Sequence, residues 1–508
     1  MATPRLNRNL LLIGSLTALA LSLAAVSNGF AGFDGAVSFL AVLAIGAGLV
    51  WVVWRLLAAE DPPRWLLPLT LGAILLRLAL AVFWLLALPI HGYDNPVNDA
   101  GYVMEDAHNR DKDAWTLAQS NEPLSVAFDD YSPHDQYGGL LFLSAAVYCF
   151  LGADTHQPLL MVVLSATVSG LAVALGWALV RRAWGDPAAA WTAWGIAFYP
   201  EAALLGSSQM REAFSVTLIA LAIYALLRWR AEPDKRKLAL VALPVLLALP
   251  LSFPVALGLA GMLILAWLAL EDWRPLRRPW VKGSLLLGAL AGLAYMLFVV
   301  DAAQLWLVQS ADWQVYVSQN ASGWVAREFE RLPAWSQVPF IVVYGIFRPL
   351  LPAAIIAGSS SALWKGIIIW RALGWTALLV FLLYASFLAL RERGWRRLPG
   401  ALLLSNWVLV LIASYRGGGD DWDSPRYRAA LAVIQIGLAA WALQRQRESQ
   451  GPWLRRALVG GGLVIAWFVP WYLRRYAAFE WPVIDLDQVV GLGLASAVLY
   501  FFWDWHRA

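Results

Sequence analysis

Residues 64–90 read RWLLPLTLGAILLRLALAVFWLLALPI, in which Arg77 is the only charge after the first position. A helix needs about 20 predominantly apolar residues to cross a bilayer, and lipid offers an open backbone no hydrogen-bond partner. This run therefore predicts a membrane-spanning helix. Similar runs lie on both sides of it, at 9–30, 35–57, 158–180, 188–207, 211–228, 237–250, 252–270, 283–300, 371–390, 399–415, 427–444, 456–474 and 489–504. The sequence predicts an all-α polytopic membrane protein with about 14 transmembrane helices.

The composition excludes several other classes of protein. The chain has 508 residues, of which 60% are hydrophobic and 14% are charged, whereas soluble domains are about half apolar and a quarter charged. A single cysteine, Cys149, rules out a disulfide scaffold. The net charge of +4 is small, so no nucleic-acid partner is expected. The 30 tryptophans fit a chain with long stretches at the membrane–water interface.

The short loops between the apolar runs carry Lys and Arg clusters, which are enriched on the cytoplasmic side of membrane proteins. With about 14 spans, these clusters fall on the same side as Arg5 and Arg8, and Arg474–Arg475 is the exception. Both termini are therefore expected inside, and residues 91–138 and 301–370 outside. The clusters are Arg181–Arg182, Arg228–Lys237, Arg274–Lys282, Arg391–Arg397 and Arg445–Arg456.

Four parts follow from this arrangement. Residues 1–60 form a two-helix N-terminal membrane extension, and residues 61–300 form a transmembrane module that includes the outer loop 91–138. Residues 301–370 form an outer loop, whose many tryptophans favour interfacial helices. Residues 371–508 form C-terminal transmembrane helices. The apolar segment 138–152 is too short to span and is expected to be interfacial or re-entrant.

The outer loop 91–138 is strongly acidic, and it begins where the run 64–90 leaves the membrane. Asp94 and Asp99 lie closest to that exit. A carboxylate in this place can act as a general base on a hydroxyl, or hold a divalent cation against a phosphate. The alternative is a solvated acidic loop, and the two interpretations have similar weight. Four further acids are expected on the solvated polar face of a following helix, namely Glu105, Asp106, Asp111 and Asp113.

Later in the same loop, His134 and Asp135 precede the pair Gly138–Gly139. The two side chains resemble a metal-binding or acid–base pair, but adjacent polar residues more often cap the next helix. The histidines of the chain lack the spacing of a zinc site. No metal site is therefore predicted; the cofactor stays unknown, and a divalent cation is compatible with the loop without being required by the sequence.

Two basic groups open helices on the expected outer side. Arg211 and Glu212 begin one run, and Arg426-Tyr427-Arg428 precedes another after a glycine-rich acidic loop. An arginine can grip a phosphate with its planar fork, or it can lift its charge to the lipid headgroups. The second alternative is favoured for Arg211, and the two are equal for Arg426 and Arg428. Arg77, midway along its run, is expected to face the bundle or a wet cavity.

The order of these features resembles the GT-C superfamily of membrane glycosyltransferases, especially the branch around protein O-mannosyltransferases and lipid A aminoarabinose transferases. The resemblance covers residues 64–230 well and 370–445 loosely. It rests on Arg77 inside a helix, on Asp99 before Tyr102 and Ala107, on Phe150-Leu151-Gly152, on Val180-Arg181-Arg182-Ala183-Trp184-Gly185-Asp186, on Tyr199-Pro200-Glu201, on Arg211-Glu212-Ala213 and on Arg426-Tyr427.

The resemblance implies transfer of a sugar from a polyprenyl-phosphate carrier to a glycan, lipid or protein acceptor, at the extracytoplasmic face of the plasma (inner) membrane. It implies an essential acid in the first outer loop, which position matching assigns to Asp99, with Asp94 second. Substrate contacts are expected from Tyr102, His134, Asp135, Arg211, Glu212, Arg426 and Arg428. The alternatives are a transporter or flippase of lipid-linked saccharides and a catalytically inactive relative. Asp99, Arg211 and Arg426 are expected to approach one outward-facing cavity.

Overall fold

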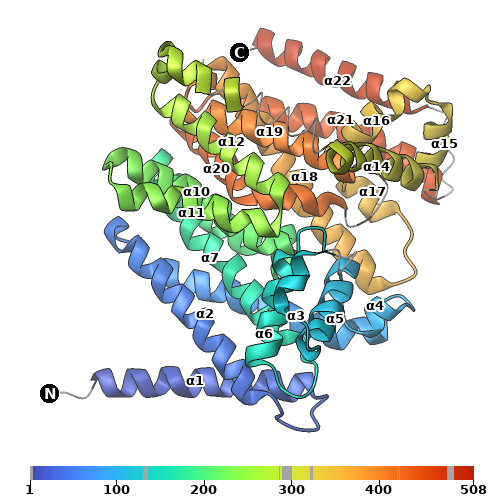
Figure 1. The fold of residues 1–508 in the computed structure, drawn as a ribbon. Coiled ribbons are helices and arrows are strands. Elements are labelled where there is room, and N and C mark those ends of the chain that lie inside the picture. The colour runs from blue at the N-terminus through green and yellow to red at the C-terminus, as the bar shows by residue number, and fades with distance from the viewer. Residues whose placement is uncertain are drawn as a thin grey trace. The chain divides into compact units, whose positions relative to one another are not determined.

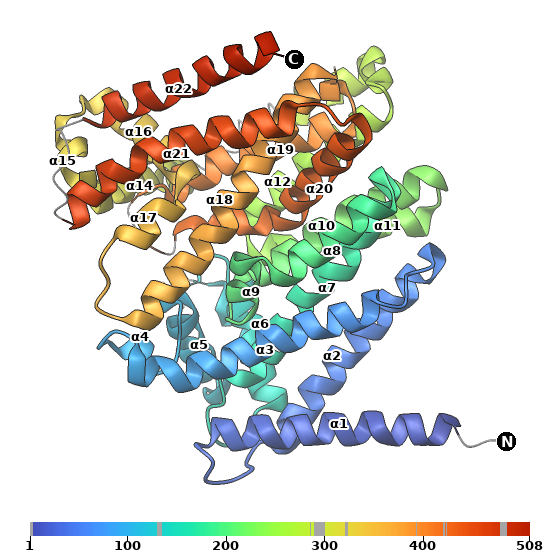
Figure 2. The same cartoon turned by 180° about the vertical axis from the view of Figure 1, so that it is seen from behind.

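The computed structural model describes residues 4–129, 135–284, 286–288, 300–320, 324–392, 394–419, 422, 424–477 and 485–507. Within these ranges the chain is helical, with no strand, as Figures 1 and 2 show from two sides. The chain divides into two compact units, Met1–Ala260 and Gly261–Ala508, with the boundary inside α12. Each unit is described by itself.

The first unit is built around α3 and α7, which pack against each other. Short helices α4, α5 and α6 gather beside the end of α3 that leads into the predicted outer loop (Figures 1 and 2). The helices of this unit are α1 (Pro4–Ser27), α2 (Ala36–Leu57), η1 (Ala58–Glu60), α3 (Leu66–His91), α4 (Pro96–Asp99), α5 (Glu105–Gln119), η2 (Leu124–Phe128), α6 (Gly139–Leu151), α7 (Leu159–Trp184), α8 (Asp186–Phe198), α9 (Pro200–Gly206), α10 (Arg211–Ala231), α11 (Lys235–Leu251) and, across the boundary, α12 (Phe253–Leu270).

In the second unit, the two last helices pack along each other and α18 packs on α20. Its helices are η3 (Arg274–Arg277), α14 (Val300–Gln319), α15 (Trp324–Arg331), α16 (Ala334–Phe347), α17 (Leu351–Ile356), α18 (Ala362–Arg391), η4 (Gly394–Arg396), α19 (Leu398–Gly417), η5 (Ser424–Leu431), α20 (Ala432–Ser449), α21 (Trp453–Ala477) and α22 (Leu486–Arg507).

In the described part of the chain, 10 helices are long and apolar enough to cross a membrane. The chain is thus a multi-pass membrane protein, but the predicted number of 14 spans is not confirmed within the described residues. Predicted span 188–207 breaks into α8 and α9, and α11 has only 17 residues. Predicted span 427–444 begins as the 3-10 helix η5, and its helix α20 is too polar to count. Span 283–300 lies largely outside the described residues.

The break between α8 and α9 explains the buried Arg77. Pro200 has no N–H to bond the Ile196 carbonyl, and Tyr199 before it is extended. Arg77 fills the gap, because its Nη2 donates to the Ile196 oxygen at 3.1 Å and its Nη1 to the Ala197 oxygen at 3.4 Å. Its Nε donates to Ser169 Oγ at 3.0 Å. The guanidinium therefore faces the bundle, as predicted, and lies at the partly negative carboxyl end of α8.

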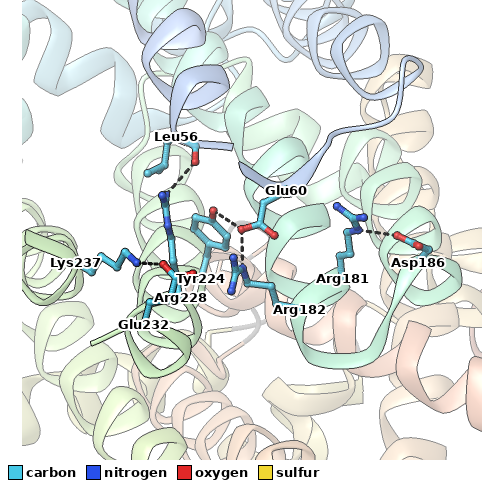
Figure 3. A network of polar contacts seen from close by, with 9 residues as sticks. All are labelled: Leu56, Glu60, Arg181, Arg182, Asp186, Tyr224, Arg228, Glu232 and Lys237. Atoms are coloured by element: carbon cyan, nitrogen blue, oxygen red, sulfur yellow. Dashed lines mark hydrogen bonds and ion pairs between the residues drawn. The ribbon is translucent and has the colours of Figure 1, made fainter. Parts of the chain in front are cut away.

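The N-terminal helices are fastened to the module that follows them. At one end of α2, Glu60 accepts hydrogen bonds from Arg182 Nε at 2.6 Å and from the Tyr224 hydroxyl at 2.9 Å, while Arg228 donates to the Leu56 carbonyl at 3.0 Å (Figure 3). At the other end, Gln157 Nε2 donates to the Asp34 carbonyl at 2.7 Å. Residues 1–60 are therefore held to the first unit at both ends of α2.

The predicted outer segment 301–370 consists of helices α14 to α17 and the start of α18 in its described residues. The span predicted at 371–390 begins earlier, because the Ser361 side chain caps α18 by accepting from the Trp364 N–H. Trp364 therefore lies in the first turn of a long helix rather than in a surface segment. α14 turns a buried polar stripe of Ser310, Gln314 and Ser318 inward, spaced four residues apart on one helix face.

Candidate active site

Asp94 and Asp99 lie on a short structured turn that follows α3. The Asn95 side chain accepts hydrogen bonds from the N–H groups of Val97 and Asn98, so it caps α4 at its first turn. Pro96 occupies the first helical position, where its missing N–H costs nothing. Asp99 is the last residue of α4. The carboxylates of Asp94 and Asp99 are both exposed, on a backbone that the cap holds in place.

α5 carries the next part of the loop, and its buried face is not apolar throughout. Ala107, Ala114 and Leu117 face inward, and so do Arg110 and Asp111, which share that face by helical spacing. The prediction that Asp111 belongs to a solvated polar face is therefore wrong, since Asp111 is 0% exposed. Glu105, at the start of α5, is exposed as predicted.

Asp111 is the centre of a cluster drawn from four segments. Its Oδ2 accepts from the Tyr102 hydroxyl at 2.5 Å and lies 2.8 Å from His156 Nε2. Its Oδ1 accepts from the Tyr148 hydroxyl of α6. Burial, followed by the charge of Asp111, holds the pKa of Tyr102 well above its usual value. Tyr102 therefore stays a hydrogen-bond donor, and its hydroxyl is directed to Asp111.

Arg110 belongs to a second buried cluster next to the first. Its Nε lies 3.5 Å from Asp135 Oδ2, and Arg211 Nη1 lies 3.7 Å from the other oxygen of Asp135. Asp135 also accepts from the Leu141 N–H at 2.9 Å, so it caps α6. Burial lowers the pKa of Arg110, and the charge of Asp135 opposes this effect. Two guanidinium groups thus share one buried carboxylate.

Gln209 joins the two clusters. Its carbonyl accepts from Arg110 Nη1 at 2.9 Å, and its side-chain Nε2 lies 3.4 Å from the Tyr148 hydroxyl. The structure therefore brings predicted residues Asp135 and Arg211 together at the start of α10, where Glu212 is buried beside them. Next to them lie the buried charges of Arg110 and Asp111, which the sequence does not predict as site residues. Tyr148 and His156 lie against Asp111 and join α5 to the segments after it. His134 lies outside the described residues.

In the second unit, Arg426 and Arg428 are both 5% exposed, but their surroundings differ. Arg428 donates to the Gly345 carbonyl at 2.8 Å and to the Arg348 carbonyl, and its guanidinium lies 3.6 Å from the centre of the Trp375 ring. Arg426 lies over the Tyr427 ring at 5.1 Å. Arg428 therefore holds the backbone around α16 in place.

Among the described residues, no three His, Cys, Asp or Glu side chains lie so that they could hold a metal ion together. The exposed pair Asp94 and Asp99 and the buried Asp111 lie on different parts of the loop. Asp111 is already surrounded by two phenols and an imidazole. The arrangement around Asp111 fits hydrogen bonding rather than coordination of a cation.

No family model and no curated protein matches the sequence. Among solved structures, the chain is similar to the archaeal oligosaccharyltransferase AglB from Archaeoglobus fulgidus in complex with an inhibitory peptide and a dolichol-phosphate, with 15% identity, a TM-score of 0.39, and coverage of 86% of this chain and 54% of that chain.

A second structure of the Archaeoglobus fulgidus oligosaccharyltransferase, tethered with an acceptor peptide, gives 15% identity, a TM-score of 0.39, and coverage of 86% of this chain and 56% of the other. The chain thus spans about half the length of the solved chains that it matches. A TM-score of 0.39 is a distant likeness, so the function of the chain has to be argued from its own residues.

Proposed function

We propose that the chain is a membrane glycosyltransferase of the GT-C type, which moves a sugar from a polyprenyl-phosphate donor to an acceptor at the extracytoplasmic face of the plasma membrane. One observation carries the proposal: a capped turn at the end of α3 presents the exposed carboxylate of Asp99, and buried charged clusters lie behind it in the same loop. An exposed acid on a fixed turn is suited to proton transfer at the membrane edge.

The chemistry needs few groups, because a glycosyl phosphate already contains a good leaving group. The acceptor oxygen forms a bond to the anomeric carbon of the sugar, and the bond from that carbon to the phosphate oxygen breaks. Asp99 takes the proton of the acceptor, and polyprenyl phosphate leaves as an anion. Asp94, exposed on the same turn, is the second choice for the base.

The residues proposed to contact substrate have separate tasks. Arg211, with Asp135 and the buried Glu212 beside it, offers a charged group at the start of α10. Arg426 is proposed to meet the carrier phosphate, since a guanidinium recognises phosphate oxygens through paired N–H donors. Arg428 is the weaker choice for this task because carbonyl groups already occupy its Nη atoms.

Transport of a lipid-linked saccharide is the competing function. Transporters place ionisable groups near the middle of the membrane, where they meet the substrate. Arg77 is the charge deepest in α3, and Ser169 and the end of α8 use its donors. The feature that favours transport thus has a structural explanation, which leaves glycosyl transfer as the proposal.

The test is release of polyprenyl phosphate by purified protein from a panel of polyprenyl-phosphate sugars. The Asp99→Asn substitution keeps the size of the side chain but removes the proton acceptor, so turnover should fall roughly 10²–10⁴-fold with carrier binding unchanged. The Arg426→Ala substitution should weaken carrier binding as well as turnover. Glu105→Gln is the matched control, because Glu105 is another exposed acid of the same loop.

Equal, near-full activity of the Asp99→Asn and Glu105→Gln proteins would show that Asp99 is not the base. Asp94→Asn is then the next variant to measure. Full activity of that protein too, or movement of an intact lipid-linked sugar without release of polyprenyl phosphate, would replace glycosyl transfer by transport.

A further inference from the structure

The turn that carries Asp99 is closed on itself by Asn98. This side chain is buried; its Oδ1 accepts from the Tyr93 N–H at 2.7 Å, and its Nδ2 donates to the Tyr102 carbonyl at 3.2 Å. The Tyr102 N–H in turn donates to the Val97 carbonyl at 3.0 Å. Residues 93–102 therefore form one small hydrogen-bonded unit, and Tyr102 is its last member.

Tyr102 is also the member through which this unit reaches α5. Gly101 just before it has a φ of +77°, and a Cβ there would meet Leu85 of α3 at 2.7 Å. The left-handed glycine lets the chain pass close to α3 and direct the Tyr102 side chain at Asp111. The hydroxyl donates to Asp111 Oδ2 at 2.5 Å. Tyr102 thus ties the turn to α5 through this hydrogen bond and through the edge-to-face contact of its ring with His108 of α5, at 5.1 Å between ring centres. The hydroxyl is the part of this tie that a single substitution removes while the ring stays.

Asp111 is a costly residue in this place. It is 0% exposed, and a buried carboxylate costs several kcal/mol unless donors compensate it. Its donors are the hydroxyls of Tyr102 and Tyr148, and the ring of His156 lies beside it, with Nε2 2.8 Å from Oδ2. A well-packed apolar residue usually serves stability as well or better. A carboxylate is needed, however, to fix several donors in a defined geometry.

We infer that Asp111 is a positioning residue of the transfer reaction, which holds the turn with Asp99 in its working place through the Tyr102 hydroxyl. This inference rests on the proposed function. The inference gives the three contacts of Asp111 different roles. Only the contact to Tyr102 connects Asp111 to the turn that carries Asp99. The contact to Tyr148 joins α5 to α6 and leaves residues 93–102 untouched.

The experiment compares Tyr102→Phe with Tyr148→Phe in the full chain. Each substitution removes one hydroxyl that donates to the same carboxylate, and Tyr148→Phe also removes the 3.4 Å contact of that hydroxyl with Gln209. The control therefore loses at least as many polar contacts as the test variant. Turnover of the Tyr102→Phe protein should fall about 10²-fold, the loss expected when a catalytic group moves by about 1 Å, with carrier binding unchanged. Tyr148→Phe should stay within about threefold of wild type, since the turn keeps its tie.

Two further measurements separate positioning from a general loss of structure. Asp111→Ala removes the acceptor, so it should lose at least as much turnover as Tyr102→Phe, and the double variant should lose no more than Asp111→Ala, because both substitutions remove one shared contact. Hydrogen exchange of the amides of Val97, Asn98 and Asp99 should be faster in Tyr102→Phe and unchanged in Tyr148→Phe. A merely structural role would instead make the losses of turnover follow the losses of thermal stability in both proteins.

The inference is overturned if Tyr102→Phe keeps wild-type turnover, or if both phenylalanine variants lose turnover in proportion to their folded fraction. If Asp99→Asn is inactive while Tyr102→Phe is active, the proposed function stands and only the positioning role fails. If the wild-type protein transfers no sugar, the proposed function fails. The exchange rates then show separately whether Tyr102 holds the turn.

Discussion

Two buried carboxylates of the first unit, Asp111 and Glu60, lie beyond opposite ends of α3 and are held in different ways. Glu60 receives a guanidinium and a phenol, from Arg182 and Tyr224 (Figure 3). Asp111 receives two phenols and an imidazole, and neither Lys nor Arg is among its described partners. α3 has 26 residues, so about 39 Å of helix lies between the two ends.

The difference shows how charge is compensated at each end. An arginine is always charged, so Glu60 has a permanent counter-charge. Asp111 relies on the neutral hydroxyls of Tyr102 and Tyr148. At the Glu60 end, a buried ion pair and a hydrogen bond therefore hold the end of α2 against α7 and α10. The end with Asp111 is built to fix the geometry of a loop.

The largest expected effect concerns the side of the membrane on which each end lies. Single cysteines at Asn121 and Glu232, both exposed, are introduced into a Cys149→Ala protein, which has no other cysteine. Basic loops stay in the cytoplasm, so an impermeant thiol reagent applied to intact cells should label position 121 fully and position 232 only after the membrane is opened. Labelling of both positions in intact cells would contradict the topology.

The second effect is a loss of stability at the Glu60 end. Arg182→Ala leaves the mostly buried Glu60 without its cation, and hydrogen bonds to charged groups contribute about 1.5–3 kcal/mol. The thermal midpoint in detergent should fall accordingly, while turnover of the folded protein at low temperature stays near wild type. Arg181→Ala is the control, since its pair with Asp186 is largely exposed (Figure 3) and such pairs contribute about 0–1 kcal/mol.

An equal fall of the midpoint in both arginine variants would mean that the burial of Glu60 does not matter. A loss of turnover in Arg182→Ala at constant folded fraction would mean that the two ends of α3 are coupled. Either result would contradict the proposed difference, in which the contacts of Glu60 serve stability and those of Asp111 position the turn with Asp99.

Parts of the fold that depend on neighbouring residues can be predicted from the sequence, whereas parts that depend on contacts between distant residues cannot. Spans such as α3 and α7 follow from apolar length alone. The start of α18 at Ala362 was missed because the run before 371 carries Lys365 and several tryptophans. The helix break at Pro200 is not predicted, because the apolar run continues on both sides of Pro200. What makes the break stable is a hydrogen bond from Arg77 of α3 to the Ile196 carbonyl, and these two residues are 119 positions apart in the sequence.

The site was predicted in the same uneven way. Asp99 is a candidate because position matching to the resembled family selects it, and Asp135 and Arg211 are candidates because each precedes or begins a helix; all three stay predictions. The sequence predicts a solvated face for Asp111, because acids usually are solvated. Its spacing from Ala107 and Ala114 was the available signal, since it places Asp111 on the apolar face of α5. Its partners Tyr148 and His156 come from later segments, which one sequence does not pair.

The smallest expected effect uses the Tyr102 phenol at Asp111, which can lose its proton, whereas the Arg182 guanidinium at Glu60 keeps its charge. The pKa of Tyr102 is raised well above its usual value in the folded protein, while the unfolded chain loses this proton near pH 10. Above about pH 10 the folded state thus binds more protons than the unfolded state, and stability falls as pH rises. Below pH 10 this contribution is fully present.

Tyr102→Phe removes that proton, so the loss of stability above pH 10 should become shallower, by at most about 1.4 kcal/mol per pH unit. Thermal midpoints of the wild-type and Tyr102→Phe proteins between pH 9 and 11 measure this slope, and Glu105→Gln, which removes no phenol, should keep the wild-type slope. Because Arg182 keeps its charge in this range, Arg182→Ala should lower the midpoint without changing the slope. Equal slopes for wild type and Tyr102→Phe would mean that the Tyr102 hydroxyl does not keep its proton at Asp111, and the contact that ties the turn of Asp99 to α5 would then lose its main support.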